Sequence, residues 1–215
     1  MKAAELSGIL RQIGLTFIVC LVLQVRVDDG RLVLLALQAA ALASQLRRLR
    51  GFAESPEAQR AWAGAFGAAV VCTIVGVVGL VPAVEPGLVN LLAAILLLQG
   101  TISYCSLLAH WSRRTGWSDA ASAFDRARWW CAANLGVVGV AAAAHLLLGP
   151  RAGAGDEGSI DPGILLGRVL RGWPVLAALL VVTILWIAAM VSLQLANRKV
   201  RAGLRAQPEA IVVRA

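Results

Sequence analysis

The segment HWSRRTGWSDAASAFDRARWWC, residues 110–131, is the longest polar interval lying between two long apolar runs of this chain. It holds four of the seven Trp residues, four Arg and two Asp. Because an apolar run of membrane-spanning length lies on each side, the interval sets the direction in which both runs leave it. Every other apolar run can be oriented relative to this one.

Composition predicts that the solvent of this protein is a lipid bilayer. The 215 residues are 59% hydrophobic and 15% charged, and the mean hydropathy is +0.76. Apolar runs of this length form helices in a membrane, because each backbone polar group must be satisfied within the segment. The expected fold class is therefore all-α, a polytopic integral membrane protein in a single transmembrane domain, residues 1–215.

Six transmembrane helices are predicted, with approximate bounds 8–25, 32–46, 61–81, 88–109, 131–148 and 174–195. The second run spans only about 23 Å as a helix, short of a hydrocarbon core of about 30 Å. The first two runs therefore form either a full hairpin or a shallower, re-entrant one. In both cases the two ends return to the same side of the membrane.

Local sequence signals mark several helix ends. Ser55-Pro56-Glu57 predicts a helix start, with an N-cap residue, Pro at the first helical position and an acid near the positive helix end. Gly116 and Ser118 are expected to close one helix and cap the next. The low-complexity loop 149–159 is followed by a short amphipathic segment, which predicts an interfacial helix, and Gly172-Trp173-Pro174 is expected to break it before the last span.

The arginines predict the orientation of the spans. If both termini and the loops 47–60 and 111–130 share one side, that side holds 15 of the 20 Lys and Arg residues. The external loop 149–172 and the connection after the first span hold the other five. Loops rich in Lys and Arg stay in the cytoplasm, so we expect cytoplasmic termini and a cytoplasmic tail, 197–215. The 18 Arg against 2 Lys suggest a GC-rich bacterial genome, and hence a bacterial inner membrane.

The net charge of +8 does not indicate nucleic acid, because the basic residues sit at the ends of apolar runs. Membrane lipids and other protein subunits are the expected partners. Tryptophan and arginine gather in one short interval, which favours anchoring at the interface or contact with a partner. The residues assigned to this role are Trp111, Arg113, Arg114, Trp117, Arg126, Arg128, Trp129 and Trp130.

The sequence predicts no catalytic residue, no metal site and no cofactor. No span carries an ionisable residue at its middle, and no nucleophile or phosphate-binding motif occurs. His110 and His145 fall on opposite faces of the predicted membrane, so they cannot ligate one haem together. His110 is the residue named for a haem with one axial ligand. Cys105, His110 and Cys131 are the remaining cluster considered for a metal.

Small residues recur at four-residue spacing on two spans, where they allow helix backbones to approach closely. Gly64, Ala68, Cys72 and Gly76 form the row on the third span, and Ala132 and Gly136 begin the row on the fifth. Both rows are predicted to pack against other helices.

The leading hypothesis is a non-catalytic integral subunit of a larger inner-membrane complex, with a scaffold or partner-docking role. The alternative is a transport component, either a six-span permease subunit or a solute binder with its site among Asn90, Gln99, Asn134 and Trp186. At the level of topology the layout resembles permease subunits of ATP-driven transporters, although no motif carries the resemblance. A third hypothesis, an electron-transfer subunit with haem or a pigment, predicts a coloured protein.

Overall fold

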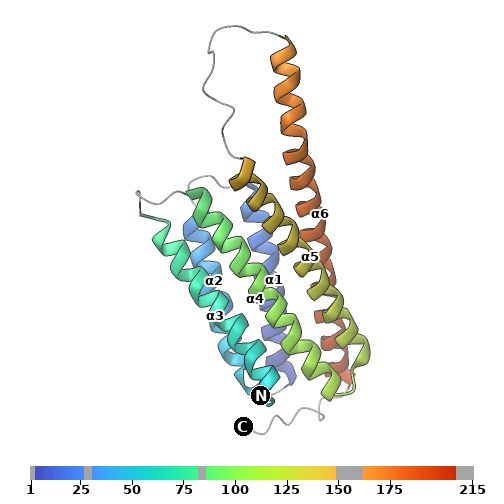
Figure 1. Ribbon diagram of the computed structural model, residues 1–215. Helices are drawn as coiled ribbons and strands as arrows, with labels where there is room; N and C mark the ends of the chain where they lie inside the picture. Colours follow the sequence, from blue (N-terminus) through green and yellow to red (C-terminus); the bar gives the residue numbers. More distant parts are fainter. Residues whose placement is uncertain (1–2, 27–30, 82–85, 149–161, 207–215) are drawn as a thin grey trace.

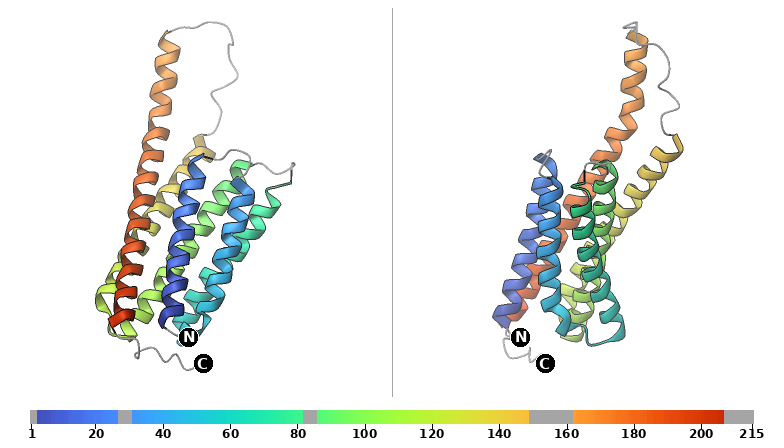
Figure 2. Two further views of the ribbon diagram at one scale, coloured as in Figure 1. Left: turned by 180° about the vertical axis from the view of Figure 1, so that it is seen from behind. Right: turned by 90° about the vertical axis from the view of Figure 1, so that its left-hand side faces the viewer.

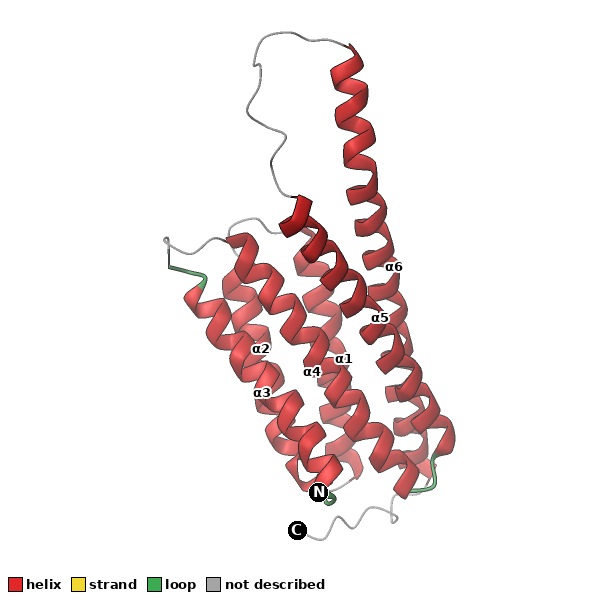
Figure 3. Cartoon of the chain, viewed as in Figure 1, coloured by secondary structure: helices red, strands yellow, loops and turns green. Residues whose placement is uncertain are grey.

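The computed structural model describes residues 3–26, 31–81, 86–148 and 162–206, which form six α-helices and one 3-10 helix without any strand (Figure 3). In chain order the elements are α1 (Ala3–Arg26), α2 (Arg31–Arg48), η1 (Leu49–Phe52), α3 (Pro56–Val78), α4 (Pro86–Arg114), α5 (Ser118–Leu148) and α6 (Pro162–Ala206). The all-helical prediction is confirmed for these ranges. The predicted low-complexity loop and the last nine residues lie outside them.

Helices that follow one another in sequence lie beside one another in space. Each of α2 to α6 packs along its predecessor, and α1 closes the bundle by contacting both α2 and α6 (Figures 1 and 2). Successive helices run in opposite directions, so α1 begins and α6 ends at the same end of the bundle. We call this end the basic end, because α2, α4 and α6 all finish there with arginine in the last turn.

The core is best packed near the basic end, where the largest fully buried side chains gather. Tyr104 and Leu108 of α4 and Phe124 of α5 are 1% exposed or less. Away from this end, α3 and α6 expose large aliphatic side chains instead, namely Val71, Ile74, Val77, Leu180, Ile184, Ile187 and Val191. Surfaces of this kind mark contact with lipid or with another protein.

Three helical segments among the described residues are long and apolar enough to cross a membrane: Pro56–Val78, Leu92–Arg114 and Leu180–Ala206. The prediction of six spans is therefore supported by length and composition at three of its six positions. α2 is only 18 residues long and ends in two arginines. The first three turns of α5 contain two acids and two arginines, which lower its hydropathy.

The predicted break at Gly172-Trp173-Pro174 is wrong, because α6 runs without interruption for 45 residues. At 1.5 Å per residue its length is about 68 Å, and its first turns extend beyond the other helices (Figure 1). The separate interfacial helix is therefore absent, and its residues are the first turns of α6. Proline removes a single backbone donor, and the apolar turns on both sides keep their own hydrogen bonds.

Helices also extend into the regions predicted as polar connections. The interval 111–130 is helical except at Thr115–Trp117, and the predicted tail is helical up to Ala206. Val200 and Leu204 of that tail are buried against the bundle, so its first part belongs to the fold and is not a free polar extension. The third predicted span ends at Val78, three residues earlier than expected.

Candidate functional site

The turn between α4 and α5 positions most of the residues that the sequence singled out. Gly116 has φ 79°, a left-handed conformation that glycine adopts without strain. The backbone N–H of Trp117 donates to the Ser112 carbonyl at 2.8 Å, which closes α4, and the Trp117 carbonyl accepts from Ala121 at 3.0 Å, which opens α5. The predicted helix end at Gly116 is confirmed, whereas Ser118 is the first residue of α5 and Trp117 occupies the cap position. Three residues therefore suffice to reverse the chain.

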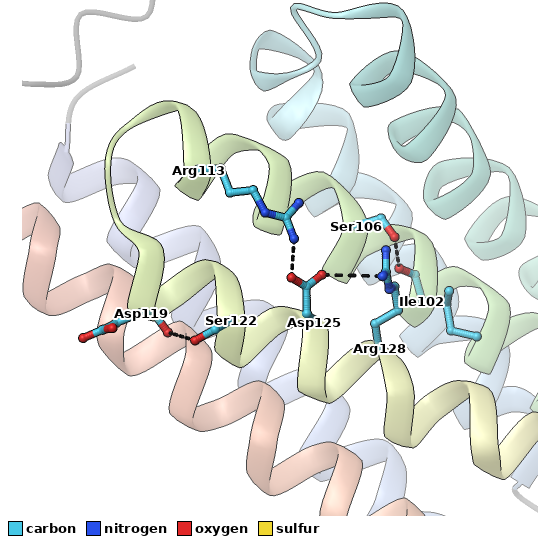
Figure 4. A network of polar contacts seen from close by, with 7 residues as sticks. All are labelled: Ile102, Ser106, Arg113, Asp119, Ser122, Asp125 and Arg128. Atoms are coloured by element: carbon cyan, nitrogen blue, oxygen red, sulfur yellow. Dashed lines mark hydrogen bonds and ion pairs between the residues drawn. The ribbon is translucent and has the colours of Figure 1, made fainter.

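Three of the four arginines of interval 111–130 are paired with acids. Arg113 and Arg128 both contact the carboxylate of Asp125, the latter at 3.7 Å, so one acid on α5 joins two basic side chains (Figure 4). Arg114 contacts Glu54 at 3.1 Å and connects α4 to the segment before α3. Arg126 is exposed and has no acid partner among the described residues.

Two of the four tryptophans of the interval face the interior. Trp111 is 8% exposed and meets the rings of Phe52 and Trp117 edge-on, at centroid distances of 5.1 and 5.2 Å. Trp117 in turn covers Gly203 of α6. These indoles hold η1, the turn and the end of α6 together. Their structural role is packing, and the outward-facing part of the predicted anchoring set is smaller than the sequence suggested.

Trp129 and Trp130 are the outward-facing pair, with exposed fractions of 72% and 42%. Along α5 they are followed by a stripe of small residues that also faces outward. A Cβ added at Gly136 or Gly139 would meet no atom within 4 Å. We call this surface the α5 outer face; it comprises Trp129, Trp130, Ala132, Ala133, Gly136, Gly139 and Val140.

The small-residue row of α3 faces the inside of the bundle instead. Ala68, Cys72 and Gly76 are buried, and a Cβ at Gly76 would lie 3.0 Å from the Ala36 Cβ of α2. A Cβ at Gly64 would lie 2.9 Å from the Ser103 hydroxyl of α4. The row is therefore used inside the chain, where it lets α2, α3 and α4 approach closely.

His110 is held by Ser55, the residue that caps α3. The Ser55 hydroxyl accepts from the Ala58 backbone N–H at 3.1 Å, as the cap signal predicted, and lies 3.1 Å from Nε2 of His110. The imidazole is thus directed toward α3. Within the described ranges no three His, Cys, Asp or Glu side chains gather to hold a metal, so His110 does not join Cys105 and Cys131 in such a group. The side chain of His145 lies outside the description.

The four side chains considered for a solute site are not brought together as a set. Asn134 is buried and donates to the Val182 carbonyl of α6 at 3.5 Å, one turn from Trp186. Gln99 is exposed on α4. The side chain of Asn90 is not among those described. Asn134 Oδ1 and Trp186 Nε1 are buried atoms without a hydrogen-bond partner in the described part of the chain.

Sequence reasoning missed the buried polar side chains of Tyr104 and Asn197. Tyr104 and Asn197 are each 1% exposed and lie near one another between α4 and α6. The hydroxyl and both amide atoms lack hydrogen-bond partners of ordinary geometry among the described residues. Tyr104 is the single tyrosine of the chain and sits within an apolar run, which is the signal that would have identified it.

No family model, curated protein or solved structure matches this chain.

Proposed function

We propose that this protein is a non-catalytic, integral subunit of a larger bacterial inner-membrane complex, with six spans and both termini in the cytoplasm. The exposed aliphatic surfaces of α3 and α6 support a bilayer environment, since few soluble proteins leave such surfaces uncovered. The gathering of arginines at the basic end supports the cytoplasmic assignment of that end.

The α5 outer face is the observation on which the docking role rests. Lipid provides no hydrophobic drive between helices, so association in a membrane depends on close backbone approach. Gly136 and Gly139 leave open space for such an approach. The space beside Gly64 and Gly76 of α3 is filled by the chain's own helices, whereas that beside Gly136 and Gly139 of α5 is not. We therefore assign the α5 outer face to a transmembrane helix of a partner subunit.

Trp129 and Trp130 extend the same face toward the basic end. Large aromatic side chains with exposed rings are enriched at the energetic centres of protein interfaces. Arg126 lies one turn before Trp129 and Trp130, and its guanidinium is exposed. A partner helix on the glycines would thus meet two indoles and a positive charge where it leaves the membrane.

Site-specific photo-crosslinking in native membranes tests this role. A photoreactive residue at position 133 is expected to capture one defined protein, and Gly136→Leu is expected to reduce the yield at least tenfold by blocking close approach. Gly67→Leu on α3 is the matched control, because Gly67 also has open space around its Cβ position. Equal crosslinking in both variants, or purification of a monomer without any associated chain, would refute the docking role.

A second candidate is a transport component that binds a small solute between α5 and α6. The unpartnered atoms of Asn134 and Trp186 favour it, since buried polar groups usually have partners. Asn134→Leu separates the two functions. It should abolish solute uptake if the site is real, and it should leave crosslinking from the α5 outer face unchanged.

A further inference from the structure

A pre-positioned arginine lies where α2, η1 and α3 meet, on a different part of the surface from the α5 outer face. The guanidinium carbon of Arg50 lies 5.7 Å from the centroid of the Trp62 ring, within the range of a cation–π contact. The indole is itself fixed, because its Nε1 donates to the Leu46 carbonyl at 2.8 Å. Phe66 stacks beneath the indole, with centroids 5.3 Å apart and planes within 7°.

The donors of Arg50 have no carboxylate to bind. No ion pair involves Arg50 within the described ranges, and the nearby acid Glu54 is bound to Arg114. Arg47 and Arg48, at the end of α2 and directly before η1, are also exposed and lack an acid partner among the described residues. The end of α2 and η1 thus carry three exposed arginines within residues 47–50, so the local field favours an anion.

We infer that this corner binds the phosphate of an anionic phospholipid headgroup, with Arg50 as the central ligand. Arginine recognises phosphate through paired N–H donors, and the contact with Trp62 holds the guanidinium of the exposed Arg50 in place for it. Below it, Trp62 and Phe66 continue toward the exposed aliphatic surface of α3. From Arg50 onward, the surface changes from charge to indole to aliphatic side chains. A headgroup with attached acyl chains matches this order better than a free phosphate does. The inference does not depend on the docking role proposed for α5.

The test compares lipid preference in Arg50→Gln with that in Arg113→Gln. Both changes remove one positive charge from the basic end, but Arg113 is already paired with Asp125. The intact chain is reconstituted in nanodiscs of phosphatidylglycerol and phosphatidylcholine, and the ratio of the two lipids retained after extraction is measured by native mass spectrometry. A ratio within one sample does not change merely because less protein folds.

We expect Arg50→Gln to reduce the phosphatidylglycerol preference about fivefold, the factor that corresponds to one basic residue at an anionic surface. Arg113→Gln should leave the preference within about twofold of the wild type, and Arg50→Lys should retain part of it. An equal loss in Arg50→Gln and Arg113→Gln would overturn the site, since the attraction would then be general. A further arm adds inorganic phosphate to phosphatidylcholine discs. Thermal stabilisation there equal to that by phosphatidylglycerol would assign the corner to a free anion and overturn the lipid proposal.

Discussion

The side-chain amide of Gln194 donates a hydrogen bond of 2.7 Å to the backbone carbonyl of Gly14, joining α6 to α1 across 180 positions of sequence. In this geometry the amide nitrogen lies only 2.7 Å from where a Cβ at position 14 would be, so a larger residue there would displace the amide. α1 touches only α2 and α6 extensively, so this hydrogen bond is one of the specific contacts that close the bundle.

Gln194→Leu is expected to lower the stability of the bundle by about 1 kcal/mol, the typical contribution of an interhelical hydrogen bond in a membrane protein. Thermal unfolding in a mild detergent measures the change. Gln99→Leu is the matched control, because Gln99 is exposed and its replacement removes no contact between helices. Equal melting temperatures for the two variants would show that the link to Gly14 contributes nothing.

Gly203→Ala is expected to destabilise the basic end by about 1–3 kcal/mol through overpacking. The new Cβ would lie 2.9 Å from Cε2 of Trp117, and that ring is held against Trp111 and cannot move away freely. Gly67→Ala gives the comparison, since its Cβ meets nothing and alanine has the higher helix propensity. In chemical unfolding, the free energy of unfolding should be lower than that of the wild type for Gly203→Ala and higher for Gly67→Ala.

Gly76→Ala should separate α2 from α3, with a loss of stability of about 1–3 kcal/mol. The atoms in the way include the backbone nitrogen and Cα of Ala36, each at 3.2 Å, and a backbone cannot rotate aside as a side chain can. Gly136→Ala on the α5 outer face should leave the stability of the monomer unchanged or raise it. The same unfolding assay applies to both variants. Equal losses in the free energy of unfolding would contradict the distinction between the small-residue rows of α3 and α5.

Tyr104→Phe is expected to leave the melting temperature unchanged or to raise it. The Tyr104 hydroxyl has no hydrogen bond of ordinary geometry among the described residues, and a buried polar group in that state costs about 1–3 kcal/mol, so its removal relieves that cost. Asn197→Leu should behave in the same way. A clear fall in melting temperature for either variant would instead indicate that a bound group, such as an internal water, links the two side chains.

Reporter fusions test the proposed orientation in the membrane. A reporter fused before Ala3 and another fused after Ala206 should both report the cytoplasm, because the two ends lie on the same side of the bundle (Figure 2). A reporter inserted within 149–161 should report the opposite side. Cytoplasmic activity of the inserted reporter would contradict the assignment from arginine counts.

Local signals predicted the helix ends well where the chemistry is contained in a few neighbouring residues. Ser55 caps α3 through its own hydroxyl, and Gly116 reverses the chain because it tolerates a positive φ. The same reasoning predicted a helix break at Pro174, and that prediction is wrong. A proline removes one hydrogen bond of a helix, and α6 continues through Pro174 in spite of that loss.

By itself, the sequence determined that the described residues are helical, where α2 and α3 begin, and which end of the bundle is basic. These properties follow from residue type and near-neighbour chemistry. Only the tertiary structure decided that Ala68, Cys72 and Gly76 of α3 face inward while Gly136 and Gly139 face outward. It also decided that Trp111 is buried while Trp129 is exposed. The physical reason is that spacing defines a face of a helix, whereas the rotation of each helix against its neighbours decides what that face contacts.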